Sequence, residues 1–188
     1  MMKKGIILFL LLVSFGLSGY RKPDVYVIDA VKNSNIHNNL GIMYMNEKYY
    51  YAAIEEFKIA ISLNPDSQAS AVYYNNLGEC FTLIGYPQLA TDCFERALKI
   101  YSLNLKYYIN LAQNFIELKQ TDKKLEQFKD FSNPYNRIMT GVLLVESGNI
   151  KDGVTVLDNF TISEPKLIIT PAIKSYIKSS LKKAKQAG

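Results

Sequence analysis

The most constraining feature of this sequence is an internal repeat. A leucine–glycine pair, an aromatic residue, an alanine, a phenylalanine and a second alanine recur in the same order and at the same offsets. The two glycines lie 37 residues apart. The shared positions are Leu40, Gly41, Tyr44, Ala53, Phe57 and Ala60, closed by Pro65, and then Leu77, Gly78, Phe81, Ala90, Phe94 and Ala97. A period of this size predicts a chain of stacked, similar units.

The spacing within one copy predicts a hairpin of two helices. Leu40, Gly41 and Tyr44 share one stripe of a first helix, and Ala53 and Phe57 share a stripe of the next. Small residues let the two helices approach closely, while the aromatic rings fill the space beside them. One hairpin cannot cover its own apolar surface, so it must stack on another.

This signature resembles the tetratricopeptide repeat (TPR). The resemblance implies an all-α fold, a right-handed superhelical solenoid of antiparallel helix pairs with three to four repeats and a C-terminal capping helix. We expect units at about residues 34–67, 71–104, 105–133 and 134–167 within a domain at 34–169. The first unit has His37 where the family often has tryptophan, a core position, and the second has Ser102 in place of proline.

The third and fourth units depart further from the pattern. Lys124 replaces a small alanine in the third, which argues against close packing of that helix pair. Gly153 occupies the alanine position of the fourth. Only 29 residues separate Ala112 from Gly141, so the connection between these two units must be short. The positions that do fit are Tyr108, Leu111, Ala112, Phe115 and Phe128, and then Gly141, Leu144, Gly148, Leu157 and Pro165.

The two ends of the chain have distinct compositions. Residues 170–188 predict a basic capping helix, with Thr170 as N-cap and Pro171 at the first helical position. At the other end, Lys3 and Lys4 precede an apolar run over residues 5–17, which predicts a signal peptide at 1–18 followed by a linker at 19–33. Retention of this segment as an uncleaved anchor is the alternative.

These ends bear on location and partners. Tyr20 stands where a lipoprotein would need cysteine, so no thioether lipid anchor is expected. We expect export to a periplasmic or secreted location, or else membrane anchoring. The formal net charge is +5, but five lysines lie in the last fifteen residues without an acid. The domain therefore shows no basic face for nucleic acid.

No catalytic or metal-binding constellation is present in the sequence. The single histidine cannot build a triad or a metal site, and no phosphate loop, dinucleotide fingerprint or CxxC motif occurs. Glu55 and Glu56 lie on an amphipathic helix and predict a solvated face. We expect no enzyme activity, no cofactor and no bound metal.

In the TPR family the first helices of the repeats line a concave groove that holds partner peptides or proteins. The resemblance therefore implies a binding groove. The residues expected to line it are Asn38, Asn39, Ile42, Asn75, Asn76, Glu79, Lys106, Asn110 and Gln113. Asn39, Asn76 and Asn110 share one repeat position, where they can bind an extended peptide or join adjacent repeats. Only Asn76 and Lys106 match the family's clamp for a C-terminal carboxylate, which argues against such a clamp.

Two further features remain open. Tyrosine clusters at 49–51, 73–74 and 107–108 can pack between hairpins or form an aromatic surface, and packing is favoured. Cys80 and Cys93 can be bridged or remain buried thiols. The function expected is a non-catalytic interaction scaffold in the cell envelope that holds a protein or peptide in the groove. The alternative is a membrane-peripheral protein held by an uncleaved N-terminal anchor and the lysine-rich C-terminal helix.

Overall fold

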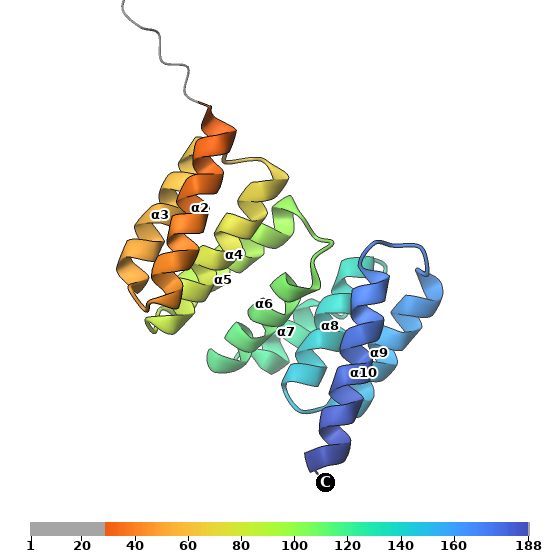
Figure 1. Cartoon of the computed structure of the whole chain (residues 1–188). Coiled ribbons are helices and arrows are strands. Elements are labelled where there is room, and N and C mark those ends of the chain that lie inside the picture. The colour runs from red at the N-terminus through yellow and green to blue at the C-terminus, as the bar shows by residue number, and fades with distance from the viewer. Residues whose placement is uncertain (1–28, 188) are drawn as a thin grey trace, which may run out of the picture.

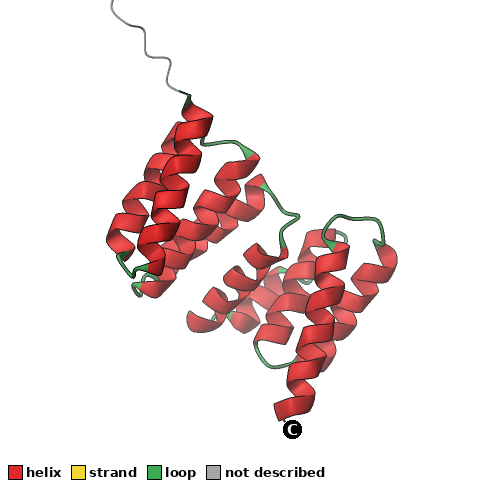
Figure 2. Cartoon of the chain, viewed as in Figure 1, coloured by secondary structure: helices red, strands yellow, loops and turns green. Residues whose placement is uncertain are grey.

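The computed structural model describes residues 29–187, and every regular element in that range is an α-helix (Figure 2). The predicted signal peptide at 1–18 lies outside these residues, as does most of the predicted linker. The helices are α2 (Ala30–Asn46), α3 (Tyr50–Leu63), α4 (Gln68–Leu83), α5 (Pro87–Ile100), α6 (Leu105–Glu117), α7 (Thr121–Gln127), α8 (Pro134–Glu146), α9 (Ile150–Ser163) and α10 (Thr170–Ala187).

Consecutive helices pair into four antiparallel hairpins that stack in one direction (Figure 1). The pairs are α2–α3, α4–α5, α6–α7 and α8–α9, and α10 packs on α9 at the end of the stack. The predicted all-α solenoid of helix pairs with a terminal helix is thereby confirmed. Helix α2 begins at Ala30 and α4 at Gln68, a few residues before the expected unit starts at 34 and 71.

Short polar side chains begin the first helices of the hairpins. Asp29, Ser67, Asn104 and Asn133 each accept a backbone N–H of the first helical turn that follows. These N–H groups have no partner within the helix, so the caps help to fix where each hairpin starts. Thr170 differs from these caps, because it is the first residue of α10 and its hydroxyl donates to the Glu164 carbonyl at 2.6 Å.

Each hairpin turns through one residue with positive φ. These residues are Lys48 (φ 65°), Gly85 (φ 80°), Lys119 (φ 56°) and Gly148 (φ 96°). Left-handed backbone is easy for glycine and costs energy for lysine. The turn geometry is therefore common to all four hairpins, although only two of them use the residue that suits it.

A glycine–phenylalanine pair locks each of the first two hairpins. A Cβ atom added at Gly41 would lie 2.6 Å from the Phe57 ring, and one added at Gly78 would lie 2.6 Å from the Phe94 ring. Both rings are buried. The glycine thus leaves room for the ring of the second helix, which is why the two residue types recur together.

The third hairpin lacks this lock. Helix α7 has seven residues, none of them buried, whereas α3, α5 and α9 have 14 each. Lys124 stands in the alanine position, with its Nζ 4.3 Å from the centroid of the Phe115 ring and 3.7 Å from a Glu95 oxygen. A long side chain therefore separates α7 from α6, and α6 packs directly against α8 as well.

In the fourth hairpin the unexpected glycine tightens the packing. A Cβ atom at Gly153 would lie 2.7 Å from both the Gly141 carbonyl oxygen and the Val145 nitrogen. The backbones of α8 and α9 therefore approach more closely than alanine would allow. Leu157 takes the place of phenylalanine against Gly141, where an added Cβ would lie 2.6 Å from its Cγ.

The apolar core forms two main clusters along the stack. One lies among α3, α4 and α5 and includes Phe57, Leu77 and Cys80; the other extends from α5 to α10 and includes Phe94, Phe115 and Phe160. The expectation that His37 is a core residue is wrong: it is half-buried, and its Nδ1 lies 2.6 Å from a Glu56 oxygen. Glu56 is half-buried too, so only Glu55 of that acidic pair is fully solvated.

Candidate functional site

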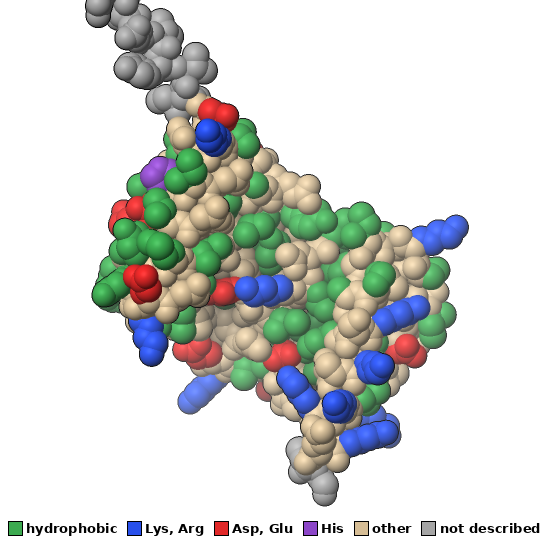
Figure 3. All heavy atoms as spheres, viewed as in Figure 1, with side chains coloured by type: hydrophobic (Ala, Val, Ile, Leu, Met, Phe, Trp, Pro, Cys, Tyr) green, Lys and Arg blue, Asp and Glu red, His purple; other side chains and the backbone are tan. Residues whose placement is uncertain are grey.

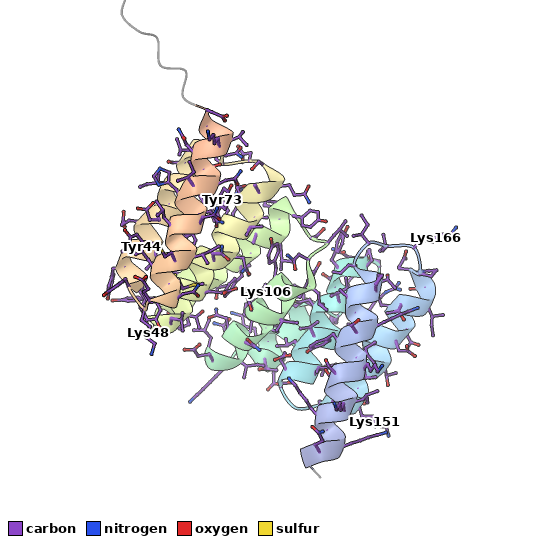
Figure 4. All side chains as sticks on the ribbon, in the orientation of Figure 1. Tyr44, Lys48, Tyr73, Lys106, Lys151 and Lys166 are labelled. Carbon is purple, nitrogen blue, oxygen red and sulfur yellow. The ribbon has the colours of Figure 1, made fainter. Side chains whose placement is uncertain are left out.

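A hollow opens between the first helices of the second and third hairpins, and its volume is about 280 Å³. Lys106 lines this hollow, and Figure 4 labels it between the second and third hairpins. The lining comes from α4, α5 and α6: Glu79, Thr82, Leu83, Phe94, Lys106, Asn110, Gln113, Asn114 and Glu117. Four of the nine predicted groove residues therefore meet here.

A polar network centred on Glu79 borders the hollow. One Glu79 oxygen accepts from the side-chain amides of Asn75 at 2.6 Å and Asn110 at 2.9 Å, and it lies 2.6 Å from the Lys106 Nζ. Asn110 also donates to the Asn75 oxygen at 2.8 Å. These bonds connect α4 to α6 and balance the charge of Lys106 within the protein.

The remaining predicted asparagines do not line this hollow. Asn76 donates to the oxygen of Asn38 at 3.0 Å, and both side chains are buried between α2 and α4. Asn39 is exposed, so the three asparagines that share one repeat position have three different surroundings. The buried pair joins adjacent repeats and does not line the hollow.

The two other predicted residues also differ from each other. Ile42 is half-buried and packs on the cluster among α3, α4 and α5. Gln113 is exposed and donates to a Glu146 oxygen at 2.8 Å. The second Glu146 oxygen accepts from the Tyr176 hydroxyl at 2.5 Å, which raises the pKa of Tyr176 together with the larger effect of burial. Gln113 thereby connects the hollow to α8 and α10.

Three further residues of the hollow were not predicted from the sequence: Leu83, Asn114 and Glu117. Leu83 and Glu117 each follow a predicted groove residue by four positions, so continuing the same helical stripe by one turn would have found them. Asn114 is buried, and its amide donates to the Pro87 carbonyl at 2.7 Å and the Thr91 hydroxyl at 2.6 Å. Its oxygen accepts no hydrogen bond, alone among the buried side-chain polar atoms of residues 29–187.

The tyrosines divide between core and surface. Tyr73, Tyr107 and Tyr108 are buried, and Tyr73 donates to an Asn35 oxygen at 2.7 Å. Burial raises the pKa of Tyr107 and of Tyr108. Tyr50 and Tyr74 are half-buried, whereas Tyr49 and Tyr51 are exposed. No aromatic surface gathers around the hollow, whose only lining ring is Phe94.

Both cysteines are free, buried thiols. Burial raises the pKa of Cys80 and of Cys93 to about 12, with smaller contributions from the neighbouring Glu79 and Asp92. Within residues 29–187 no three His, Cys, Asp or Glu side chains come close enough together to hold a metal ion. In the same range no helix has both the length and the apolar character needed to cross a bilayer.

The stacked hairpins, the glycine–phenylalanine locks and the hollow between first helices define a helical-repeat solenoid. Residues 33–102 match the family model described as tetratricopeptide repeat. Residues 33–102 therefore carry tetratricopeptide repeats, a fold that generally serves protein interaction and is generally not catalytic.

Solved structures of similar fold support this assignment of the architecture. The chain is similar to MamA, with a TM-score of 0.50 and 19% identity over 82% of this chain and 80% of that one. It is also similar to pilF of Pseudomonas aeruginosa, with a TM-score of 0.50 and 16% identity over 84% of this chain and 71% of that one. At these identities the likeness concerns the fold alone.

One curated relative has a sequence similar to this chain. The human protein O-mannosyl-transferase TMTC3 is 28% identical over 131 residues, which cover 65% of this chain. The match spans 14% of that much longer protein. The likeness therefore concerns a small part of the transferase.

Proposed function

We propose that this protein is a non-catalytic interaction module that holds an extended peptide segment of a partner protein in the hollow between α4 and α6. The observation that carries the proposal is the hollow itself, where unused polar groups and an apolar side chain meet on first helices. Helical repeats of this family generally bind proteins, and the repeat match covers both α4 and α5.

The groups left free in the hollow suit a polypeptide backbone. The buried oxygen of Asn114 has no donor, and a peptide N–H reaching the floor of the hollow would supply one. Leu83 is 54% exposed and offers an apolar contact at the rim. An extended peptide presents N–H groups, carbonyls and side chains in alternation, so it can use both kinds of group at once.

The charges of the hollow favour a basic peptide. Glu79 is balanced by Lys106, whereas Glu117 is exposed and takes part in none of the ion pairs found in residues 29–187. One carboxylate is therefore available beside Leu83. We infer that the preferred segment has a lysine or arginine next to an apolar residue.

Selection from a random peptide library tests this proposal with the full chain. Enriched peptides are expected to contain the basic–apolar pair, and their affinity is measured by fluorescence anisotropy. The variants Glu117→Gln and Leu83→Ser should each weaken binding by about tenfold, since each removes a contact of about 1–2 kcal/mol. Tyr51→Ser, on the exposed face of α3, is the control and should bind as the parent does.

Two results would contradict peptide binding in the hollow between α4 and α6. Peptides bound equally by all of these variants would place the binding surface elsewhere. Enriched peptides that are acidic or lack an apolar residue would contradict the chemistry proposed for the hollow.

We propose further that the module acts in the cell envelope after export. The support is the basic start, the apolar run and the small residues of positions 1–18 in the sequence. Sequencing of the mature N-terminus after cell fractionation tests this. A chain that starts near Gly19 in the soluble envelope fraction is expected, and a cytoplasmic chain that retains Met1 would contradict it.

A further inference from the structure

The last helix presents a continuous stripe of lysines to solvent. Its members follow one another at spacings of four, four and three residues, so they share one face of α10: Lys174, Lys178, Lys182 and Lys185. All four are exposed, and Figure 3 shows a row of basic side chains along this helix. The opposite face is packed inward, with Ile173 and Ser180 buried.

Charge is sharply divided between this end and the rest of the protein. Residues 29–164 contain 12 basic and 16 acidic side chains, a formal charge of −4, while residues 165–188 contain six lysines and no acid, a formal charge of +6. None of the ion pairs found in residues 29–187 includes a lysine of α10. Like charges four residues apart destabilise a helix. Within the described residues no ion pair offsets this repulsion between the lysines of α10.

Exposed isoleucines lie at the same end of the molecule. Ile162, in the last turn of α9, is 69% exposed, and Ile168, just before α10, is 73% exposed. Lys166 lies between them in the sequence and extends away from the helices in Figure 4. The connection between α9 and α10 therefore combines two exposed apolar side chains with a cation.

We propose that α10 and the connection before it form a docking surface for an anionic lipid membrane. The lysine stripe attracts lipid phosphates, and Ile162 and Ile168 enter the boundary between headgroups and acyl chains. Because the inner face of α10 is packed in the solenoid, the helix contacts the membrane as a rigid surface about 27 Å long. It does not insert its apolar face.

The side chains favour lipid over other polyanions. All six cations of residues 165–188 are lysines, which act as hydrated point charges, and no arginine is present for bidentate recognition. The only aromatic residue of α10, Tyr176, is half-buried and bonded to Glu146, so no ring is free to stack on a base. An acidic polypeptide would leave the two isoleucines unused.

Co-sedimentation of the full chain with vesicles tests the proposal. Vesicles of phosphatidylcholine with phosphatidylglycerol are compared with pure phosphatidylcholine, at low and at high salt. Replacing Lys174, Lys178 and Lys182 together by glutamine should weaken binding to the anionic vesicles by about fivefold per lysine. The matched control replaces Lys32, Lys99 and Lys123, which are exposed on other helices, and should change nothing. Any contribution of another segment is common to both triple variants.

A fluorophore locates the contact. The variant Ile168→Cys is labelled with an environment-sensitive dye and compared with Gln88→Cys at the start of α5; the two native cysteines are buried and do not compete. Anionic vesicles should shift the emission to the blue only at position 168. The proposal is overturned if both triple variants bind vesicles equally, if position 168 shows no shift, or if the stripe variants lose binding to polyglutamate or duplex RNA while vesicle binding is unchanged.

Discussion

At the scale of single residues, the repeat signature records steric fit between two helices. Gly41 and Gly78 face the rings of Phe57 and Phe94 at distances that leave no room for a Cβ atom. A glycine inside a helix costs about 1 kcal/mol relative to alanine, so these positions are retained for packing. Gly153 is more constrained still, because two of the three atoms nearest to an added Cβ are backbone atoms of α8.

The substitution Gly153→Ala restores the residue that the family pattern expects, and we predict that it destabilises the protein. Its Cβ would lie 2.7 Å from backbone atoms of α8 that cannot move aside cheaply. The free energy of unfolding should fall by about 2 kcal/mol, even after the gain in helix propensity. Urea denaturation measures this, with Asp158→Ala on the exposed face of α9 as control. An unchanged or raised stability would show that α8 and α9 are not in close contact.

The buried thiols predict a loss of stability in alkali. Their pKa is about 12 in the folded protein and 9.0 in an ordinary environment, so between these values the unfolded chain releases protons that the folded chain keeps. Stability is therefore complete below pH 9 and declines as the pH rises toward 12, by about 1 kcal/mol per thiol at pH 10. Urea titrations at about pH 8 and pH 10 measure the decline.

The matched comparison for that decline is the double variant Cys80→Ala, Cys93→Ala. Its loss of stability between the two pH values should be smaller than that of the parent. The buried Tyr108 and the half-buried Tyr176, whose pKa values are also raised, would account for the remainder. An equal loss in both proteins would mean that the thiols ionise as readily in the folded state as in the unfolded one.

At the scale of elements, the third hairpin shows how one residue changes a helix pair. Lys124 in the small position cannot pack like alanine, and α7 ends after seven residues without burying any of them. The sequence indicated this weakness through Lys124 and the short interval from Ala112 to Gly141. It gave no sign that α6 would pack on α8 across the shortened helix, because that contact depends on where the neighbouring hairpins lie.

The four hairpin turns predict a pair of opposite substitutions. Lys48→Gly should stabilise the protein by about 0.5–1 kcal/mol, because glycine adopts the left-handed backbone without the strain that lysine has there. The greater conformational entropy that glycine loses on folding offsets only part of this gain. Gly85→Lys should destabilise it by a similar amount, since no atom lies near an added Cβ and only the backbone conformation counts. Thermal unfolding compares the two. Shifts of the same sign would contradict a shared turn geometry.

At the scale of the whole molecule, each hairpin packs against the hairpins next to it, and α10 packs on α9 at the end of the stack. The two main core clusters lie at opposite ends of the chain and adjoin at α4 and α5. The hollow lies where these clusters adjoin, and the basic surface of α10 lies at the far end. Peptide binding and membrane contact are thus proposed for separate surfaces of one solenoid.

This architecture predicts that damage stays local. Gly41→Ala should increase hydrogen exchange in α2–α5 with little effect on α8–α10, and Gly153→Ala should do the reverse. Exchange followed by mass spectrometry on both variants measures this. A uniform loss of protection along the chain in either variant would show that the protein unfolds as a single cooperative unit.

The sequence alone determined the class of fold, because the glycine, alanine and phenylalanine positions describe contacts within one hairpin, which are local in the chain. It also placed Glu79, Lys106, Asn110 and Gln113 on first helices, and the structure brings these four together at the hollow. Only the tertiary structure decided that Asn38 and Asn76 bond to each other between hairpins, and that His37 lies beside Glu56 rather than in the core. The physical reason is that a helical stripe faces a neighbouring hairpin at some positions and solvent at others, and the stacking angle between hairpins decides which.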